Sequence, residues 1–161
     1  TSTGRTYYTA SYGKYFFLFL DSGEDKVDSD IRNLNIMITE DYVKEEAEWL
    51  KGVVASDEYK NAGMRVAFCH IPPSEKGWHG NVMVSKYFVP TLNGTGLDLM
   101  LCAHIHKYRF NEANTIGADF PVLCNANRQR IDAVVDKSGI RLDFFDETGA
   151  KIKSMKFDKK R

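Results

Sequence analysis

The stretch LDLMLCAHIH, residues 97–106, decides the expected fold, because an apolar run ends there in two histidines. Residues 97–102 have the pattern of a buried β-strand, and His104 and His106 follow it directly. The same arrangement occurs earlier in the chain, where RVAFC, residues 65–69, precedes His70. In open α/β sheets, ligand sites form at the carboxyl ends of the strands. The two segments therefore predict an α/β fold whose core strands end in histidines.

The flanking segments complete this pattern. Two apolar strands are expected at residues 7–10 and 15–20, forming a hairpin. A helix is expected from Thr39, which we predict to be its N-cap. Its apolar residues recur at helical spacing: Val43, Ala47, Leu50 and Val54. Its charged residues are expected on the other faces: Lys44, Glu45, Glu46 and Lys51. Mixed helical character follows at residues 82–92. Four short strands then predict an antiparallel meander: 121–125, 131–136, 141–145 and 151–157.

Composition limits the classes of function. The 161 residues contain 22 Lys and Arg against 22 Asp and Glu, so no overall field attracts nucleic acid or an anionic membrane. The longest strongly apolar run, residues 15–20, is far shorter than the roughly 20 residues that span a bilayer. We therefore expect a soluble chain. The three cysteines lie in apolar stretches and are expected to be buried free thiols: Cys69, Cys102 and Cys124.

Three of the four histidines, His70, His104 and His106, follow the predicted core strands. Imidazole binds zinc, iron, nickel and copper, so these residues are candidate metal ligands. A hydrolytic site with two metals usually also needs carboxylates that bring the ions close together. The candidate acids present no obvious bridging pair: Asp21, Glu24, Asp25 and Asp98.

The order of these motifs resembles the second half of calcineurin-like metallophosphoesterases, nearest to the purple-acid-phosphatase-like branch. The resemblance rests on four segments in sequence: LDSGE at 20–24, the helix containing EWL at 48–50, FCHIPP at 68–73 and LDLMLCAHIH at 97–106. It implies a four-layer α/β/β/α fold, of which residues 1–161 would form the C-terminal half with one sheet and one helical layer.

The resemblance also implies the chemistry of the parent protein. Two divalent or trivalent ions, Zn, Fe or Mn, would hydrolyse a phosphate ester. His70 and His104 would bind one ion and His106 the other. His79, in the segment WHG, resembles a loop histidine that approaches substrate in some relatives.

The family's earlier motifs, Asp-x-His, Gly-Asp-x-x-Asp and Gly-Asn-His-Asp/Glu, do not occur in the chain and are expected upstream of Thr1. The missing N-terminal half of the domain would then be a partner of this half. We expect the isolated chain to be inactive, to bind at most one ion weakly, and to self-associate through its exposed sheet. Export of the parent protein is compatible with the sequence, because a leader would also precede Thr1.

One departure concerns Ala103, because the family usually has glycine before the paired histidines. Alanine fits only if the backbone there keeps a negative φ. Two other classes of function stay open beside the phosphoesterase. One is a binding module with a single structural metal, and the other is a degenerate enzyme half that serves as a scaffold.

Overall fold

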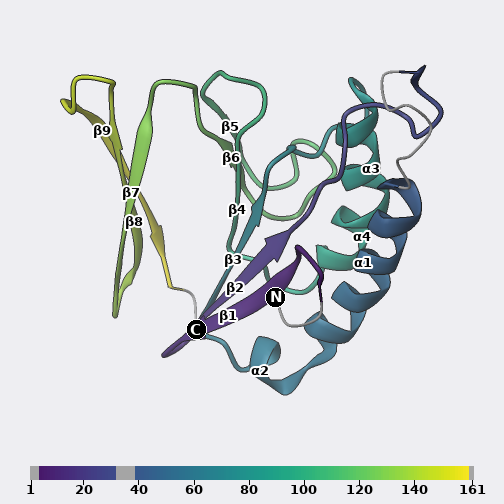
Figure 1. Cartoon of the computed structure of the whole chain (residues 1–161). Helices are drawn as coiled ribbons and strands as arrows, with labels where there is room; N and C mark the ends of the chain where they lie inside the picture. Colours follow the sequence, from purple (N-terminus) through teal and green to yellow (C-terminus); the bar gives the residue numbers. More distant parts are fainter. Residues whose placement is uncertain (1–3, 32–38, 160–161) are drawn as a thin grey trace.

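A computed structural model describes residues 4–31 and 39–159, which form three layers (Figure 1). Helices cover one face of a six-stranded mixed sheet, and a three-stranded antiparallel sheet lies on the other side. The helices are α1 (Thr39–Ala55), α2 (Asp57–Lys60), α3 (His79–Tyr87) and α4 (Val89–Leu92). The predicted α/β class is therefore confirmed.

The larger sheet has the strand order β1-β2-β3-β4-β6-β5. Its strands are β1 (Tyr8–Tyr12), β2 (Tyr15–Leu20), β3 (Met64–Cys69), β4 (Leu99–Cys102), β5 (Arg109–Asn111) and β6 (Val122–Cys124). The four central strands run parallel, with β1 and β5 as antiparallel edges. These central strands are nearly continuous apolar runs, because helices cover one of their faces and the three-stranded sheet partly covers the other. Their carboxyl ends therefore lie along one edge of the sheet.

The helix-covered face holds the larger core. Successive side chains of β2 alternate between the two faces, so Phe16, Leu18 and Leu20 point to this core. Helix α1 adds Val43, Ala47 and Leu50, as its periodicity predicted. All three cysteines are buried in this core as free thiols, as expected.

The opposite face is partly covered by the three-stranded sheet of β7 (Arg130–Asp136), β8 (Gly139–Phe145) and β9 (Lys151–Asp158). Ile140, Leu142 and Phe144 of β8 pack with a second apolar cluster from the larger sheet. That cluster comprises Tyr15, Met64, Val66, Leu99 and Leu123. The chain thus supplies strands on both sides of this core, beyond the single sheet that was expected.

Three local predictions were wrong. The segment at 121–125 is not part of the meander, because Val122–Cys124 pairs with β4 in parallel and with β5. Thr39 is the first residue of α1, and the carboxylate of Asp28 accepts hydrogen bonds from the amides of Thr39 and Glu40 at 3.0 and 3.1 Å. Glu46 lies on the buried face of α1, and its side chain accepts a hydrogen bond from the amide of Asp21 at 3.0 Å.

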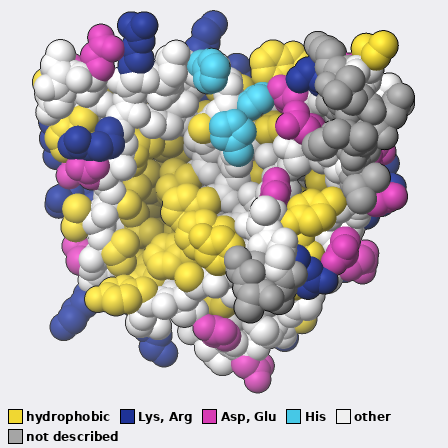
Figure 2. Space-filling view, in the orientation of Figure 1, with side chains coloured by type: hydrophobic (Ala, Val, Ile, Leu, Met, Phe, Trp, Pro, Cys, Tyr) yellow, Lys and Arg dark blue, Asp and Glu magenta, His cyan; other side chains and the backbone are white. Residues whose placement is uncertain are grey.

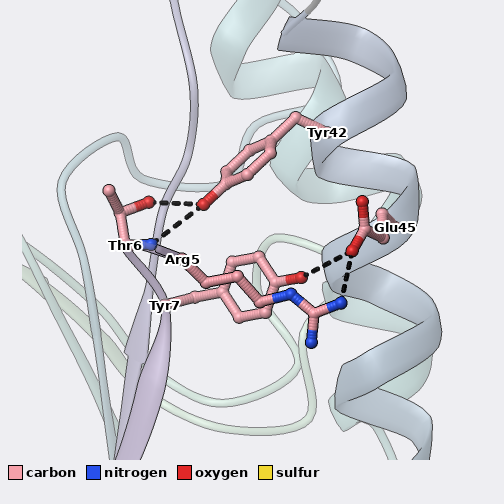
Figure 3. A network of polar contacts seen from close by, with 5 residues as sticks. All are labelled: Arg5, Thr6, Tyr7, Tyr42 and Glu45. Carbon is pink, nitrogen blue, oxygen red and sulfur yellow. Dashed lines mark hydrogen bonds and ion pairs between the residues drawn. The ribbon is translucent and has the colours of Figure 1, made fainter. Parts of the chain in front are cut away.

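The segment before β1 is bound to α1 by polar contacts (Figure 3). The amide of Thr6 donates to Tyr42 Oη at 3.0 Å, and Arg5 forms an ion pair with Glu45 at 2.6 Å. The Tyr7 hydroxyl also donates to Glu45, at 3.4 Å. These contacts fix the entry to the edge strand. In the part of the chain that the structure describes, no helix is long and apolar enough to cross a membrane.

Candidate metal centre

The loops after β2, β3 and β4 bring Asp25, His70 and His104 together at the carboxyl edge of the sheet. His104 Nδ1 lies 3.3 Å from His70 Nε2, and the two rings meet edge to face with centroids 5.1 Å apart. On the other side of the same ring, His104 Nε2 lies 2.9 Å from Asp25 Oδ2. The amide of Ala103 donates to the carbonyl of His70 at 3.0 Å, which joins the two histidine loops.

The backbone around the paired histidines is unusual. His104 and His106 have φ values of 61° and 55°, whereas Ala103 does not have a positive φ. Alanine is therefore accommodated at the position where the resembled family usually has glycine. A non-glycine residue in the left-handed region costs on the order of 1–3 kcal/mol and persists only where its surroundings hold it. The turn thus directs each histidine side chain at a cost in backbone energy.

His104 is the enclosed member of the group. Its side chain is 17% exposed and that of Asp25 is 21% exposed, while the ring of Trp78 packs edge to face on His104 at 5.1 Å. The contact between His104 Nε2 and Asp25 falls short of good hydrogen-bond geometry. Neither His104 Nε2 nor Asp25 Oδ1 has another hydrogen-bond partner among the described residues, although both atoms are buried.

The geometry of His70 and His104 fits two ligands of one tetrahedral ion. Two nitrogens bound at about 2.0–2.1 Å in such a site are roughly 3.3–3.4 Å apart. The separation of 3.3 Å in the structure matches this value and is also that of a hydrogen bond between the two rings. Asp25 lies on the opposite side of the His104 ring and so does not complete the same ligand set. Within residues 4–31 and 39–159, no three side chains of His, Cys, Asp or Glu converge as a metal site.

The other two histidines have different contacts in the structure. His106 is exposed, and its carbonyl accepts a bond from the amide of Asn127 at 3.4 Å. His79 is the first residue of α3, and its Nε2 lies 3.2 Å from Glu40 Oε1 of α1. The metal role of His106 and the substrate contact of His79 stay predictions.

A buried carboxyl group lies behind the site. Glu46 is fully buried in α1, and burial raises its pKa to about 9, although the hydrogen bond from the Asp21 amide lowers it. Burial also raises the pKa of the Cys69 thiol, which precedes His70. Glu46 lies three residues after Val43 and four before Leu50. That spacing places Glu46 on the buried face of the helix. The charged side chain led us to expect it on an exposed face instead.

An apolar groove of about 430 Å³ opens beside the histidines, between the two sheets. Its wall includes Phe19, Phe68 and Leu101, with His70 and Asn125 among its polar residues. The rings of Phe19 and Phe68 stack with centroids 5.0 Å apart, and Tyr8 stacks on Phe19 at 4.5 Å. Figure 2 shows this face as a hollow of hydrophobic side chains with histidines at its upper end.

Solved structures share the fold. No known family matches the sequence, and no curated protein matches it either. GAP50, the anchor in the inner membrane complex of Plasmodium, is similar with a TM-score of 0.61 and 15% identity over 96% of this chain. The purple acid phosphatase PPD1 of yellow lupin (Lupinus luteus) is similar with a TM-score of 0.58 and 10% identity over 94% of this chain. The chain spans 54% of the first protein and 32% of the second.

Proposed function

We propose that this chain is the C-terminal half of a metal-dependent phosphoesterase domain. The observation that carries the proposal is the pair His70 and His104, whose nitrogens lie 3.3 Å apart at the carboxyl edge of parallel strands. The similarity of the fold to a purple acid phosphatase supports the assignment of this edge to phosphate-ester chemistry. The substrate is a phosphate monoester or diester.

In this proposal His70 Nε2 and His104 Nδ1 hold one ion and His106 holds the other. Zn, Fe or Mn fits imidazole combined with carboxylate oxygen. Bound ions would polarise the phosphoryl oxygens and lower the pKa of a bound water. Trp78 would restrict rotation of the His104 ring and keep bulk water from it, since the two rings pack edge to face. His79 would contact substrate from the start of α3.

The remaining ligands would come from a partner segment, the N-terminal half of the same domain. Two observations support this. The chain covers about half or less of the structures it resembles, and the groove beside His70 is apolar and open. A partner with an apolar sheet face would cover the groove and carry carboxylates to its rim. Without it, the chain would hydrolyse nothing, bind at most one ion weakly, and associate through the groove.

Calorimetric titration of this chain with Zn²⁺ tests the ligand assignment. We expect one weak site in the unaltered chain. His70→Ala and His104→Ala should each abolish it, whereas His106→Ala should leave it intact, because His106 would serve the other ion. Two tight sites would refute the half-domain proposal, and equal binding by all variants would refute the ligands.

A second candidate is a scaffold without catalysis. It is favoured by the similarity to GAP50, an anchor protein. A scaffold would keep its stability and its partners when His70 and His104 are replaced by alanine. Co-purification of partners with that double variant of the natural protein, compared with unaltered protein, separates the candidates.

A further inference from the structure

We propose that Asp25 is a positioning residue that selects the tautomer of His104. Its carboxylate would hold the proton on His104 Nε2, which leaves the Nδ1 lone pair free to bind an ion beside His70. The inference rests on the proposed function only in assigning an ion to Nδ1. The tautomer itself is a property of the metal-free chain.

The contact geometry leaves few arrangements for the proton. His104 Nε2 is buried, has no other partner among the described residues, and lies 2.9 Å from Asp25 Oδ2. If Nε2 carried a lone pair, this electron-rich atom would lie 2.9 Å from a carboxylate oxygen. A hydrogen on Nε2 would place positive partial charge beside the carboxylate and convert this repulsion into an attraction, although the contact is not an aligned hydrogen bond. The Nε2–H tautomer is therefore favoured.

The other nitrogen then has a defined role. With hydrogen on Nε2, neutral His104 presents a lone pair at Nδ1, which lies 3.3 Å from His70 Nε2. In the metal-free chain, His70 Nε2–H can donate to this lone pair. Binding of an ion by both nitrogens would require His70 to carry its hydrogen on Nδ1 instead, so that its Nε2 also presents a lone pair. A second partner that fixes the tautomer of a ligand histidine is a general feature of metal sites.

The approach of Asp25 to the site depends on Gly80 in α3. A Cβ atom at Gly80 would lie 2.5 Å from Ile71 Cδ1, 3.0 Å from the Glu24 carbonyl and 3.4 Å from Asp25 Oδ1. The small residue thus lets the loop after β2 pack against the start of α3. Trp78, two residues earlier, packs on the other partner, His104. One segment therefore supports both members of the pair.

The test combines two readouts on Asp25→Asn, Asp25→Glu and the neighbouring control Glu24→Gln. Long-range ¹⁵N NMR of the metal-free imidazoles should show Nε2–H for His104 in the unaltered chain. Asp25→Asn should shift the ring toward Nδ1–H, because an amide can donate to Nε2. It should also weaken Co²⁺ binding by 10–100-fold, the usual effect of losing such a partner. Asp25→Glu should restore both readouts in part, and Glu24→Gln should alter neither.

Nδ1–H in the unaltered chain, or a spectrum that Asp25→Asn leaves unchanged, would overturn the inference. Unchanged Co²⁺ affinity in a folded Asp25→Asn variant would overturn the role of Asp25 in metal binding. If no variant binds Co²⁺ while the tautomer shifts as expected, the proposed function loses its metal site and the positioning role of Asp25 stands.

Discussion

The substitution Glu46→Gln should remove a large pH dependence of stability. Glu46 is fully buried in α1, and its pKa rises from 4.5 to about 9 on folding, chiefly through burial. The folded chain therefore keeps this proton over a pH range in which the unfolded chain has released it. Stability must fall as pH rises from 4.5 to 9, because the folded state binds more protons there.

The magnitude follows from the pKa difference. One proton corresponds to about 1.4 kcal/mol per pH unit, so the free energy of unfolding should fall by about 4 kcal/mol between pH 5 and 8 through this group alone. Glutamine cannot ionise, and its carbonyl oxygen can still accept the hydrogen bond from the Asp21 amide. The variant should thus gain stability relative to the unaltered chain as pH rises.

Urea unfolding followed by circular dichroism at pH 5, 6.5 and 8 measures this difference. Glu48→Gln, an exposed change in the same helix, is the matched control and should leave the pH dependence unaltered. Taking the difference between variants cancels the titration of the histidines. A Glu46→Gln curve that runs parallel to the unaltered chain at all three pH values would refute a buried, protonated Glu46.

Three further changes test other parts of the structure. Asp143→Asn should reduce the loss of stability between about pH 4 and pH 2 in acid unfolding followed by circular dichroism, because the hydrogen bond from Lys151 and further partners lower the Asp143 pKa to about 2. An unchanged acid transition would contradict this. Gly23→Ala should lower the free energy of unfolding, determined by urea unfolding, by roughly 1–3 kcal/mol. The reasons are that Gly23 has a φ of +65° and that the added Cβ would lie 2.1 Å from Thr39 Cγ2. Equal stability would show that the loop rearranges. Light scattering should find a dimer or larger species, because the apolar groove is open. Phe68→Thr should weaken this association, and a monomer at all concentrations would contradict it.

The regular elements of the fold were predictable because their periodicity reflects burial. The apolar runs at β2, β3 and β4 and the spacing of Val43, Ala47 and Leu50 identified their elements correctly. The partner of Val122–Cys124 was not predictable in this way. A short apolar run is compatible with either sheet, and its pairing depends on long-range contacts with β4 and β5.

The candidate site was predictable in part for a similar reason. Strand ends placed His70 and His104 at one edge, and the structure brings their nitrogens within 3.3 Å. Asp25 is distant in sequence from both histidines, and an acidic residue in a polar loop has the pattern of a turn residue. Its contact with His104 depends on the fold and could not be predicted from the sequence. The helical spacing of Glu46 indicates a buried position. Because a carboxylate is rarely buried, we instead predicted an exposed position.

The most direct test of the proposed phosphoesterase is hydrolysis of p-nitrophenyl phosphate and bis-p-nitrophenyl phosphate by the natural protein that contains this chain. The account predicts hydrolysis of at least one ester, with loss of activity on chelation and in His104→Ala, while His79→Ala raises KM without abolishing turnover. A folded, metal-loaded natural protein that hydrolyses neither ester, or a His104→Ala variant with full activity, would contradict the account.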